Sequence, residues 1–296
     1  MSAATVAVSA RRRDTAGRRF LASPLSRTGI VLLAVVAVFT IVGPLVYGAD
    51  PNRTHPRNTL EGPSSQFPLG TDDLGRDTLA RLIHAGLISI PAGLLAIGVG
   101  AVLGSLIGTA SGYFGGLVDN VIMRIVDILL SFPTLLTSIV VVAILGPSIS
   151  SAVIAVSVAA LPSYARVARG AVLPLRSAAF IESARISNSS KISVLFRHVL
   201  PNTLNVLLVL LVIGAGNGMI TLAALSFLGI GVQPPRADWG VMLTQGVKDI
   251  HLAPLTAAAP AAVLLITVLG INFVGEGLAA ALRVQTAPRR GGGRRG

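Results

Sequence analysis

Six stretches of this sequence are apolar over roughly the length that a helix needs to cross a lipid bilayer. They are residues 30–47, 84–111, 125–145, 149–164, 203–230 and 252–282. A bilayer core requires about 20 apolar residues per helix, and within it every backbone polar group must be paired inside the protein. Only 12% of the 296 residues are charged, too few to cover the surface of a soluble domain. The sequence therefore predicts an all-α, polytopic membrane protein with about six transmembrane helices.

The charged residues lie mostly between and outside these runs, and the balance of their signs differs from segment to segment. Residues 1–29 hold six arginines against one acid, and residues 283–296 hold five arginines and no acid. The stretch 166–197 holds six basic residues against one acid, whereas 48–81 and 231–251 are nearly balanced. Because cytoplasmic loops are enriched in Lys and Arg, we expect the three basic segments, and hence both termini, to face the cytoplasm.

The net charge of +12 does not indicate a nucleic-acid partner. The basic residues are spread over loops and tails and form no patch that is interleaved with aromatic side chains. The Gly/Arg-rich C-terminal segment is instead typical of a tail that contacts anionic membrane lipid.

The second run contains small residues at every fourth position, namely Ala92, Ala96, Gly100, Gly104, Gly108, Gly112 and Gly116. Residues four apart share one face of a helix, and small side chains let a neighbouring backbone approach closely. This ladder predicts a tight helix–helix contact.

The sequence offers no site for enzymatic chemistry. It has no Cys, no nucleophile elbow and no Gly-x-x-x-x-Gly-Lys-Ser/Thr phosphate loop, and "GTDDLGRD" at 70–77 lacks the lysine. The ionisable residues at membrane depth are Arg124, Asp127 and Glu276, and we expect Arg124 and Asp127 to pair, since they lie three apart on one helix face. An ion-coupled carrier usually places a carboxylate or His near the middle of the membrane, and none of these three residues is expected there. We therefore expect no catalytic residue, metal or cofactor in this chain, and either a passive path or an energy source in another protein.

A polar stretch, "ESARISNSSKISVLFRHVLPN" at 182–202, separates the fourth and fifth runs. "SNSS" at 187–190 breaks the pattern, and Ser189 or Ser190 can cap a new helix from Lys191. That helix is predicted to be amphipathic, with an apolar stripe of Ile192, Leu195, Phe196, Val199 and Leu200. We expect Pro201 to redirect the chain into the fifth span. From the pattern alone, such a helix could equally rest on the lipid surface.

The same stretch resembles the coupling loop of ATP-binding-cassette importer permeases. The matching pattern is Glu-x-Ala, a turn residue six positions after the Glu, and His-x-Leu-Pro-Asn. Ser183 and Asn188 depart from the usual Ala and Gly. The resemblance implies a coupling loop at 173–202 whose short helix fits a groove on an ATPase subunit. The residues assigned to it are Glu182, Ala184, Arg185, Asn188, His198, Leu200, Pro201 and Asn202.

Three further stretches are similar to the C-type permease of dipeptide, oligopeptide and nickel importers: residues 67–85, 112–133 and 225–240. The similarity spans about 25–283, although Phe67 stands where a His is usual. It implies a type I importer permease fold in a bacterial inner membrane, with a cytoplasmic tail at 1–29, a first helix at 30–47, an extracytoplasmic segment at 48–83, a transmembrane core at 84–282 and a second tail at 283–296.

The resemblance also implies partners. A second, related permease subunit would complete the path, one or two ATPase subunits would supply ATP and Mg²⁺ chemistry, and an extracytoplasmic solute-binding protein would deliver the substrate. The outer residues that would receive this protein are Asp72, Asp73, Arg76, Asp77 and Trp239; as isolated charges they could equally be a solvated outer surface. We expect peptides as substrate, with nickel as the alternative within the family and an ion-coupled secondary carrier as the alternative outside it.

Overall fold

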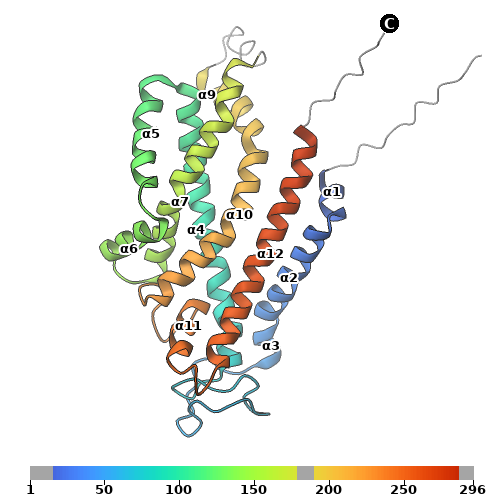
Figure 1. Ribbon diagram of the computed structural model, residues 1–296, viewed down its shortest axis with the longest axis vertical. Coiled ribbons are helices and arrows are strands. Elements are labelled where there is room, and N and C mark those ends of the chain that lie inside the picture. Colours follow the sequence, from blue (N-terminus) through green and yellow to red (C-terminus); the bar gives the residue numbers. More distant parts are fainter. Residues whose placement is uncertain (1–15, 179–189, 287–296) are drawn as a thin grey trace, which may run out of the picture.

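The computed structural model describes residues 16–178 and 190–286, and Figure 1 shows them as a bundle of long helices. Within those ranges the one β pairing is an isolated bridge between Thr71 and Asp77. The helices are α1 (Ala16–Ala22), α2 (Pro24–Ile41), α3 (Gly43–Tyr47), α4 (Thr78–Phe114), α5 (Gly116–Leu130), α6 (Thr134–Leu145), α7 (Ile149–Val172), α9 (Lys191–Val194), α10 (Leu200–Phe227), α11 (Trp239–Lys248) and α12 (Leu255–Thr286), with a 3₁₀ turn at Leu173–Ser177 and a π turn at Leu195–Val199.

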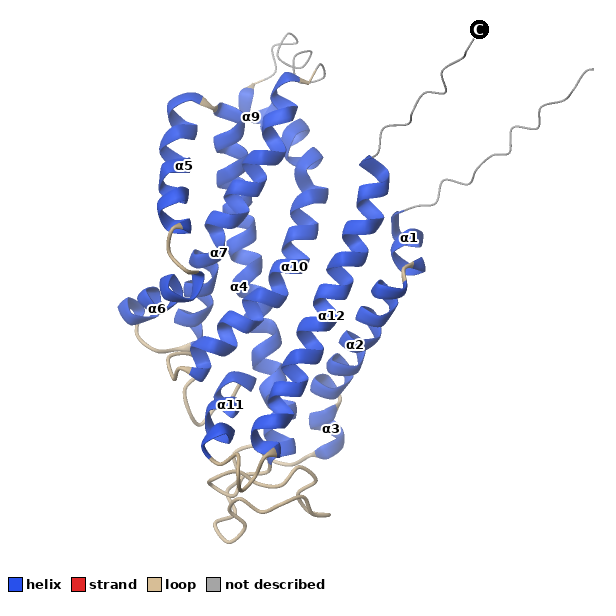
Figure 2. Cartoon of the chain, viewed as in Figure 1, coloured by secondary structure: helices blue, strands red, loops and turns tan. Residues whose placement is uncertain are grey.

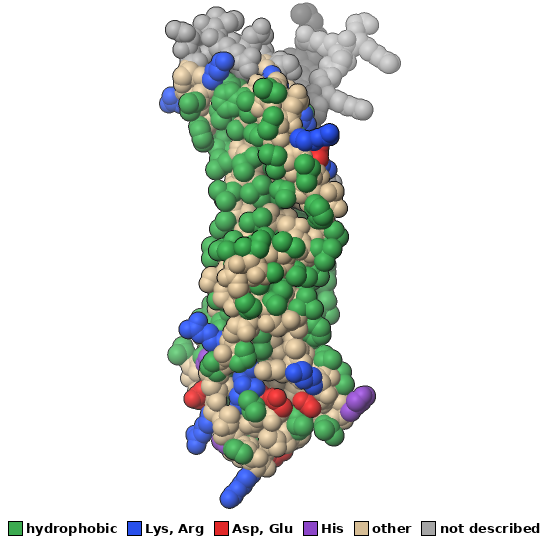
Figure 3. Space-filling model, turned by 90° about the vertical axis from the view of Figure 1, so that its left-hand side faces the viewer, with side chains coloured by type: hydrophobic (Ala, Val, Ile, Leu, Met, Phe, Trp, Pro, Cys, Tyr) green, Lys and Arg blue, Asp and Glu red, His purple; other side chains and the backbone are tan. Residues whose placement is uncertain are grey.

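The bundle has two distinct ends. At one end lie α1, the start of α5, the end of α7, α9 and the end of α12; we call it the terminal end. At the other lie α3, α11 and the long loop 48–77, which together form the loop end (Figures 1 and 2). On the face drawn in Figure 3, hydrophobic side chains cover the middle of the molecule and most charged ones lie near its ends. This distribution is what a bilayer requires of a spanning protein.

Five of the described helices are long and apolar enough to span a membrane: Pro24–Ile41, Thr78–Phe114, Ile149–Arg176, Lys191–Phe227 and Leu255–Leu282. A sixth crossing exists if α5 and α6 are counted together, although they are bent by 94° at their junction. The predicted continuous helix at 125–145 is therefore wrong. Pro133 lies at this break and starts α6, because it has no N–H to donate and its ring disfavours helical geometry in the residue before it.

The first span begins earlier than the apolar run suggested, at Pro24, and is interrupted at Val42 before α3. Helix α2 packs along α12, where small residues permit a close approach. A side chain on Gly29 would meet the carbonyl oxygen of Gly270 at 2.8 Å, and one on Gly277 would meet Ser26 Oγ. The N-terminal helix is thus fitted to the last helix rather than loosely attached.

The predicted ladder of small residues is confirmed as a tight contact between α4 and α7. A Cβ atom on Gly100, Gly104, Gly108 or Gly112 would lie 2.6, 2.4, 2.0 or 3.2 Å from a backbone oxygen of α7, in that order at Ser157, Leu161, Ala165 and Arg169. Ser157 Oγ also donates a hydrogen bond to the carbonyl oxygen of Ala96 at 2.8 Å. Gly116 is not part of this contact, because α4 ends at Phe114 and Gly116 begins α5 with φ +59°.

Candidate coupling and docking sites

The coupling loop 173–202 is described at 173–178 and again from Ser190, on the terminal end; we call residues 190–202 the coupling segment. Ser190 has an extended backbone, and its Oγ accepts a hydrogen bond from the backbone N of Ser193 at 3.2 Å. It is therefore the N-cap of the helix that follows, as one of the two predicted capping serines. The other candidate coupling residues upstream, Glu182, Ala184, Arg185 and Asn188, lie outside the described residues.

From Lys191 the chain stays helical to Phe227, so the prediction that Pro201 redirects it is wrong. A proline inside a helix lacks a donor and its ring crowds the carbonyl four residues earlier. Here the turn before it, Leu195–Val199, is widened to a π turn, and Asn202 Nδ2 donates to the carbonyl oxygen of His198 at 2.6 Å. The His-x-Leu-Pro-Asn pattern thus carries the helix past its proline without a break.

The coupling segment presents two apolar faces rather than one stripe. Val194, Leu195 and Val199 are buried against Tyr113 at the end of α4 and Val172 at the end of α7. We call this set, Tyr113, Val172, Val194, Leu195 and Val199, the anchor cluster. It orients the coupling segment on the terminal end.

The other face points away from the protein. Ile192 and Phe196, one helical turn apart, leave 64% and 54% of their surface exposed. The predicted stripe is corrected accordingly: Leu195 and Val199 belong to the anchor cluster, whereas Ile192 and Phe196 form an exposed apolar pair. Leu200 is half-buried.

A buried ionic group holds the helices beneath the anchor cluster. Asp119, in the first turn of α5, accepts hydrogen bonds from Ser111 Oγ at 2.6 Å and from Arg169 Nε and NH2 at 2.6 and 2.7 Å. This bidentate pairing joins α4, α5 and α7. Sequence reasoning missed it, although an acid three residues after Gly115-Gly116, in an otherwise apolar run, was a usable signal.

The predicted pairing of Arg124 with Asp127 is also corrected. Asp127 pairs with Arg166 of α7, and each side chain remains 55% exposed. The partner comes from another helix, which sequence spacing could not indicate.

At the loop end, "GTDDLGRD" forms a closed turn around Asp72. The Asp72 carboxylate accepts from Arg76 Nε at 2.7 Å and from the backbone N of Leu74 and Arg76 at 3.0 and 2.9 Å. Arg81 Nε lies 3.4 Å from the same carboxylate. The glycines of the stretch serve this turn, since Gly75 has φ +70° and an added Cβ would lie 2.1 Å from the carbonyl oxygen of His55.

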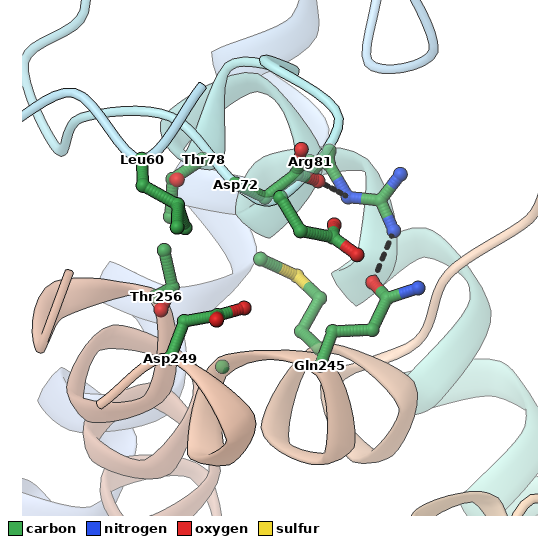
Figure 4. Close-up of a pocket in the computed structure, with 10 residues that line it drawn as sticks. Leu60, Asp72, Thr78, Arg81, Gln245, Asp249 and Thr256 are labelled. Atoms are coloured by element: carbon green, nitrogen blue, oxygen red, sulfur yellow. Dashed lines mark hydrogen bonds and ion pairs between the residues drawn. The ribbon is translucent and has the colours of Figure 1, made fainter. Parts of the chain in front are cut away.

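The turn leads directly into α4 and contacts α11. Asp77 caps α4 by accepting from the backbone N of Leu79 at 2.9 Å, and Arg81 NH2 donates to Gln245 Oε1 of α11 at 2.9 Å. Figure 4 shows the small pocket at this junction, with Asp72, Arg81 and Gln245 pointing toward one another across it. The long loop is thus fastened to the end of the bundle.

Trp239 is fully buried at the start of α11. Its backbone N donates to Ser89 Oγ at 3.0 Å, and its Nε1 donates to the carbonyl oxygen of Leu82 at 3.2 Å, so it locks α11 onto α4. The preceding Asp238 caps α11, and burial raises the pKa of its carboxyl group, although hydrogen bonds from Ser226 and Val241 act in the opposite direction.

The outer residues predicted to receive a binding protein are therefore mostly interior. Asp72, Arg76, Asp77 and Trp239 are buried, so they shape the loop end rather than present a contact surface. Of the five, Asp73 is on the surface, with 46% of its side chain exposed. The docking role stays a prediction, and only Asp73 among these residues is placed to make a direct contact.

Comparison with known proteins supplies the family. The family described as binding-protein-dependent transport system inner membrane component matches residues 100–284, and the N-terminal transmembrane domain of oligopeptide transport permease C matches residues 13–63. A dipeptide transport system permease of Alkalihalophilus pseudofirmus is 36% identical over 87% of this chain and 85% of its own length. A glutathione transport system permease of Escherichia coli is 41% identical over 90% of this chain and 88% of its own.

Among solved structures, a chain of the MetNI methionine ABC transporter in an inward-facing conformation aligns with 66% of this chain and 95% of its own, with a TM-score of 0.46 and 21% identity. Both family matches and the two permeases above agree with the multi-span helical architecture. The chain belongs to the family of inner-membrane components of binding-protein-dependent transport systems, as a multi-span permease subunit that is not itself catalytic.

Proposed function

We propose that this chain is one of two related permease subunits of an ATP-driven importer of short peptides. The observation that carries the proposal is the 36–41% identity, over about nine-tenths of the chain, to permeases of dipeptide and glutathione systems. Dipeptides and glutathione share the chemistry of short peptides: amide bonds, an amino group and carboxylates. This shared chemistry favours peptides over nickel as the substrate class.

The exposed apolar pair, Ile192 and Phe196, supports the terminal end as the ATPase-docking surface. An apolar pair one turn apart, held by a buried anchor cluster, is suited to enter a groove on a partner. The ATPase subunits would bind ATP and Mg²⁺, and their closure would push on the coupling segment. Because the anchor cluster joins that segment to the ends of α4 and α7, the push reaches the spanning helices.

The basic side chains of the terminal end support a cytoplasmic location for it. Arg18, Arg19 and Arg27 lie in or beside α1, and Lys191 and Arg197 flank the exposed apolar pair. The loop end would then face outward, where a solute-binding protein meets a loop that Asp72 and Arg81 hold in place.

Reconstitution tests this function. The chain is co-expressed with the second permease, the ATPase subunits and the solute-binding protein, purified as a complex and placed in liposomes. We expect uptake of a labelled dipeptide or of glutathione only when ATP and the binding protein are present, and none with an ATPase subunit that cannot hydrolyse ATP. Uptake of Ni²⁺ instead of peptide would contradict the substrate class. Uptake by this chain alone, driven by a proton gradient, would contradict the whole proposal.

A further inference from the structure

A pocket of about 180 Å³ opens at membrane depth between α4, α6, α7 and α10. Its polar lining consists of Thr134, Ser163, Tyr164, Asn217 and Thr221, and the lining it has among the described residues carries no charged side chain. Ser163 lies at the middle of the span Ile149–Arg176. Both Ser163 and Asn217 are exposed, and neither side chain has a hydrogen bond within the described part of the chain. Facing lipid, such groups would be unsatisfied, which is unfavourable.

The break between α5 and α6 provides an independent reason to keep lipid away from this side. Residues 131–134 are all exposed, and Thr134 lines the pocket directly after the break. Non-helical backbone at membrane depth is tolerated where it is buried in protein or lines a water-filled cavity. The side of the bundle that carries the break therefore faces a partner or water.

An exposed ion pair on this side of the bundle supports the same conclusion. The ion pair between Asp127 and Arg166 is more than half exposed, and Arg166 lies one turn from Ser163 on the same face of α7, toward the terminal end. An exposed ion pair within a span faces the interior of an assembly or an aqueous cavity. The opposite face of α7 differs, since Val153, Ile154 and Val158 line a groove with α4 whose other described members are almost all apolar.

We propose that this pocket is a solute-contact site on the translocation path, where Ser163 and Asn217, with Thr134, offer hydrogen bonds to the backbone amide groups of a passing peptide. The inference rests on the proposed function. A neutral, polar lining suits amides rather than the charged ends of a peptide, whose desolvation it could not compensate. Hydrogen bonds from a few side chains are weak enough to let the solute leave again, as transport requires.

The chain contains no Cys, so a single introduced cysteine is the one thiol of this subunit, and its labelling is measured after the subunits are separated. Ser163→Cys and Asn217→Cys are introduced separately into the assembled complex, together with Val158→Cys as the control from the apolar side of α7. A charged, lipid-insoluble thiol reagent is added during ATP turnover. We expect the first two cysteines to be labelled, labelling to slow at least two-fold with excess peptide, and Val158→Cys to stay unlabelled.

Uptake kinetics give a second measurement. Asn217→Leu and Ser163→Ala should each lower kcat/KM for peptide uptake about five-fold, the equivalent of one net hydrogen bond, with an unchanged yield of assembled complex. Asn217→Gln should restore part of the loss, and Val158→Leu should change nothing.

Failure of this inference is distinguishable from failure of the proposed function. If the unmodified complex transports peptide but the Ser163→Cys and Asn217→Cys variants are unlabelled, the pocket is covered by the partner permease. If both are labelled but excess peptide does not slow the labelling, the solute does not contact the pocket. Either result contradicts the inference. If the unmodified complex shows no ATP-driven peptide uptake, the proposed function fails first.

Discussion

Replacing Gly108 with Ala is the sharpest perturbation of the packing between α4 and α7. The new Cβ would lie 2.0 Å from the carbonyl oxygen of Ala165 and 2.6 Å from its carbonyl carbon. Both atoms are backbone, so no side chain can rotate away. Ordinary contact begins at 3.4 Å, and α4 and α7 would have to separate by roughly 1.4 Å at this level.

Gly98 of the same helix provides a matched control, because nothing lies within 4 Å of a Cβ placed there. Both substitutions gain the same helix propensity, so their difference isolates the overpacking, about 1–3 kcal/mol. The assay is the thermal unfolding midpoint of the purified protein in detergent, followed by loss of monodisperse material. Gly108→Ala should melt well below Gly98→Ala. The ladder also predicts a ranking, with Gly104→Ala next and Gly112→Ala mildest, since its added Cβ would lie 3.2 Å from the nearest backbone. Equal midpoints for Gly108→Ala and Gly98→Ala would refute the packing argument.

Three other changes test particular parts of the structure. Asp119→Ala should destabilise the protein by about 1–3 kcal/mol, because it leaves the partner arginine and serine without their acceptor; Asp119→Glu should recover part of this, and an unchanged midpoint for the alanine variant would contradict the pairing. Gly75→Ala should loosen the loop end, since φ is +70° and the carbonyl of His55 blocks the Cβ; limited proteolysis should cleave the loop 48–77 faster than in Gly62→Ala, and equal cleavage would contradict the closed turn. Asn188→Gly should keep uptake coupled, whereas Asn188→Val should lower the peptide transported per ATP, because a β-branched residue resists the positive φ expected there; a normal ratio with Val would show that the turn prediction is wrong.

The helical class and the main packing contact could be predicted from the sequence because both depend on local spacing. Apolar runs of membrane length predicted the spans, and the four-residue repeat from Gly100 to Gly112 predicted the α4–α7 contact. The break before Thr134 was less visible. Pro133 was a signal, but a proline in an apolar run equally fits a gentle kink, and only the packed helices decide between them.

The sites were harder to predict because they depend on partners distant in sequence. Asp119 and Arg169 are 50 residues apart, and Arg81 meets Gln245 across 164 residues. The family resemblance implied an outer contact surface at "GTDDLGRD", whereas the glycines fold the turn so that Asp72 is enclosed by its own loop.

The split of the predicted apolar stripe has a similar cause. Residues three and four apart do share one side of a helix, but Tyr113 and Val172 pack against only part of that side. Ile192 and Phe196 lie outside this contact and are exposed. The sequence could not separate them from the buried residues, because Tyr113 and Val172 come from other helices.

Co-purification of the ATPase subunits with a Phe196→Ser permease tests whether these subunits bind the permease at the exposed apolar pair, Ile192 and Phe196. Leu74→Ser is the control, because Leu74 is 49% exposed and lies at the opposite end of the bundle. We predict that Phe196→Ser lowers ATPase recovery at least ten-fold and abolishes ATP-driven uptake, while the permease pair stays assembled and Leu74→Ser behaves as the unmodified protein. Full ATPase recovery together with coupled uptake by the Phe196→Ser complex would contradict docking at this surface.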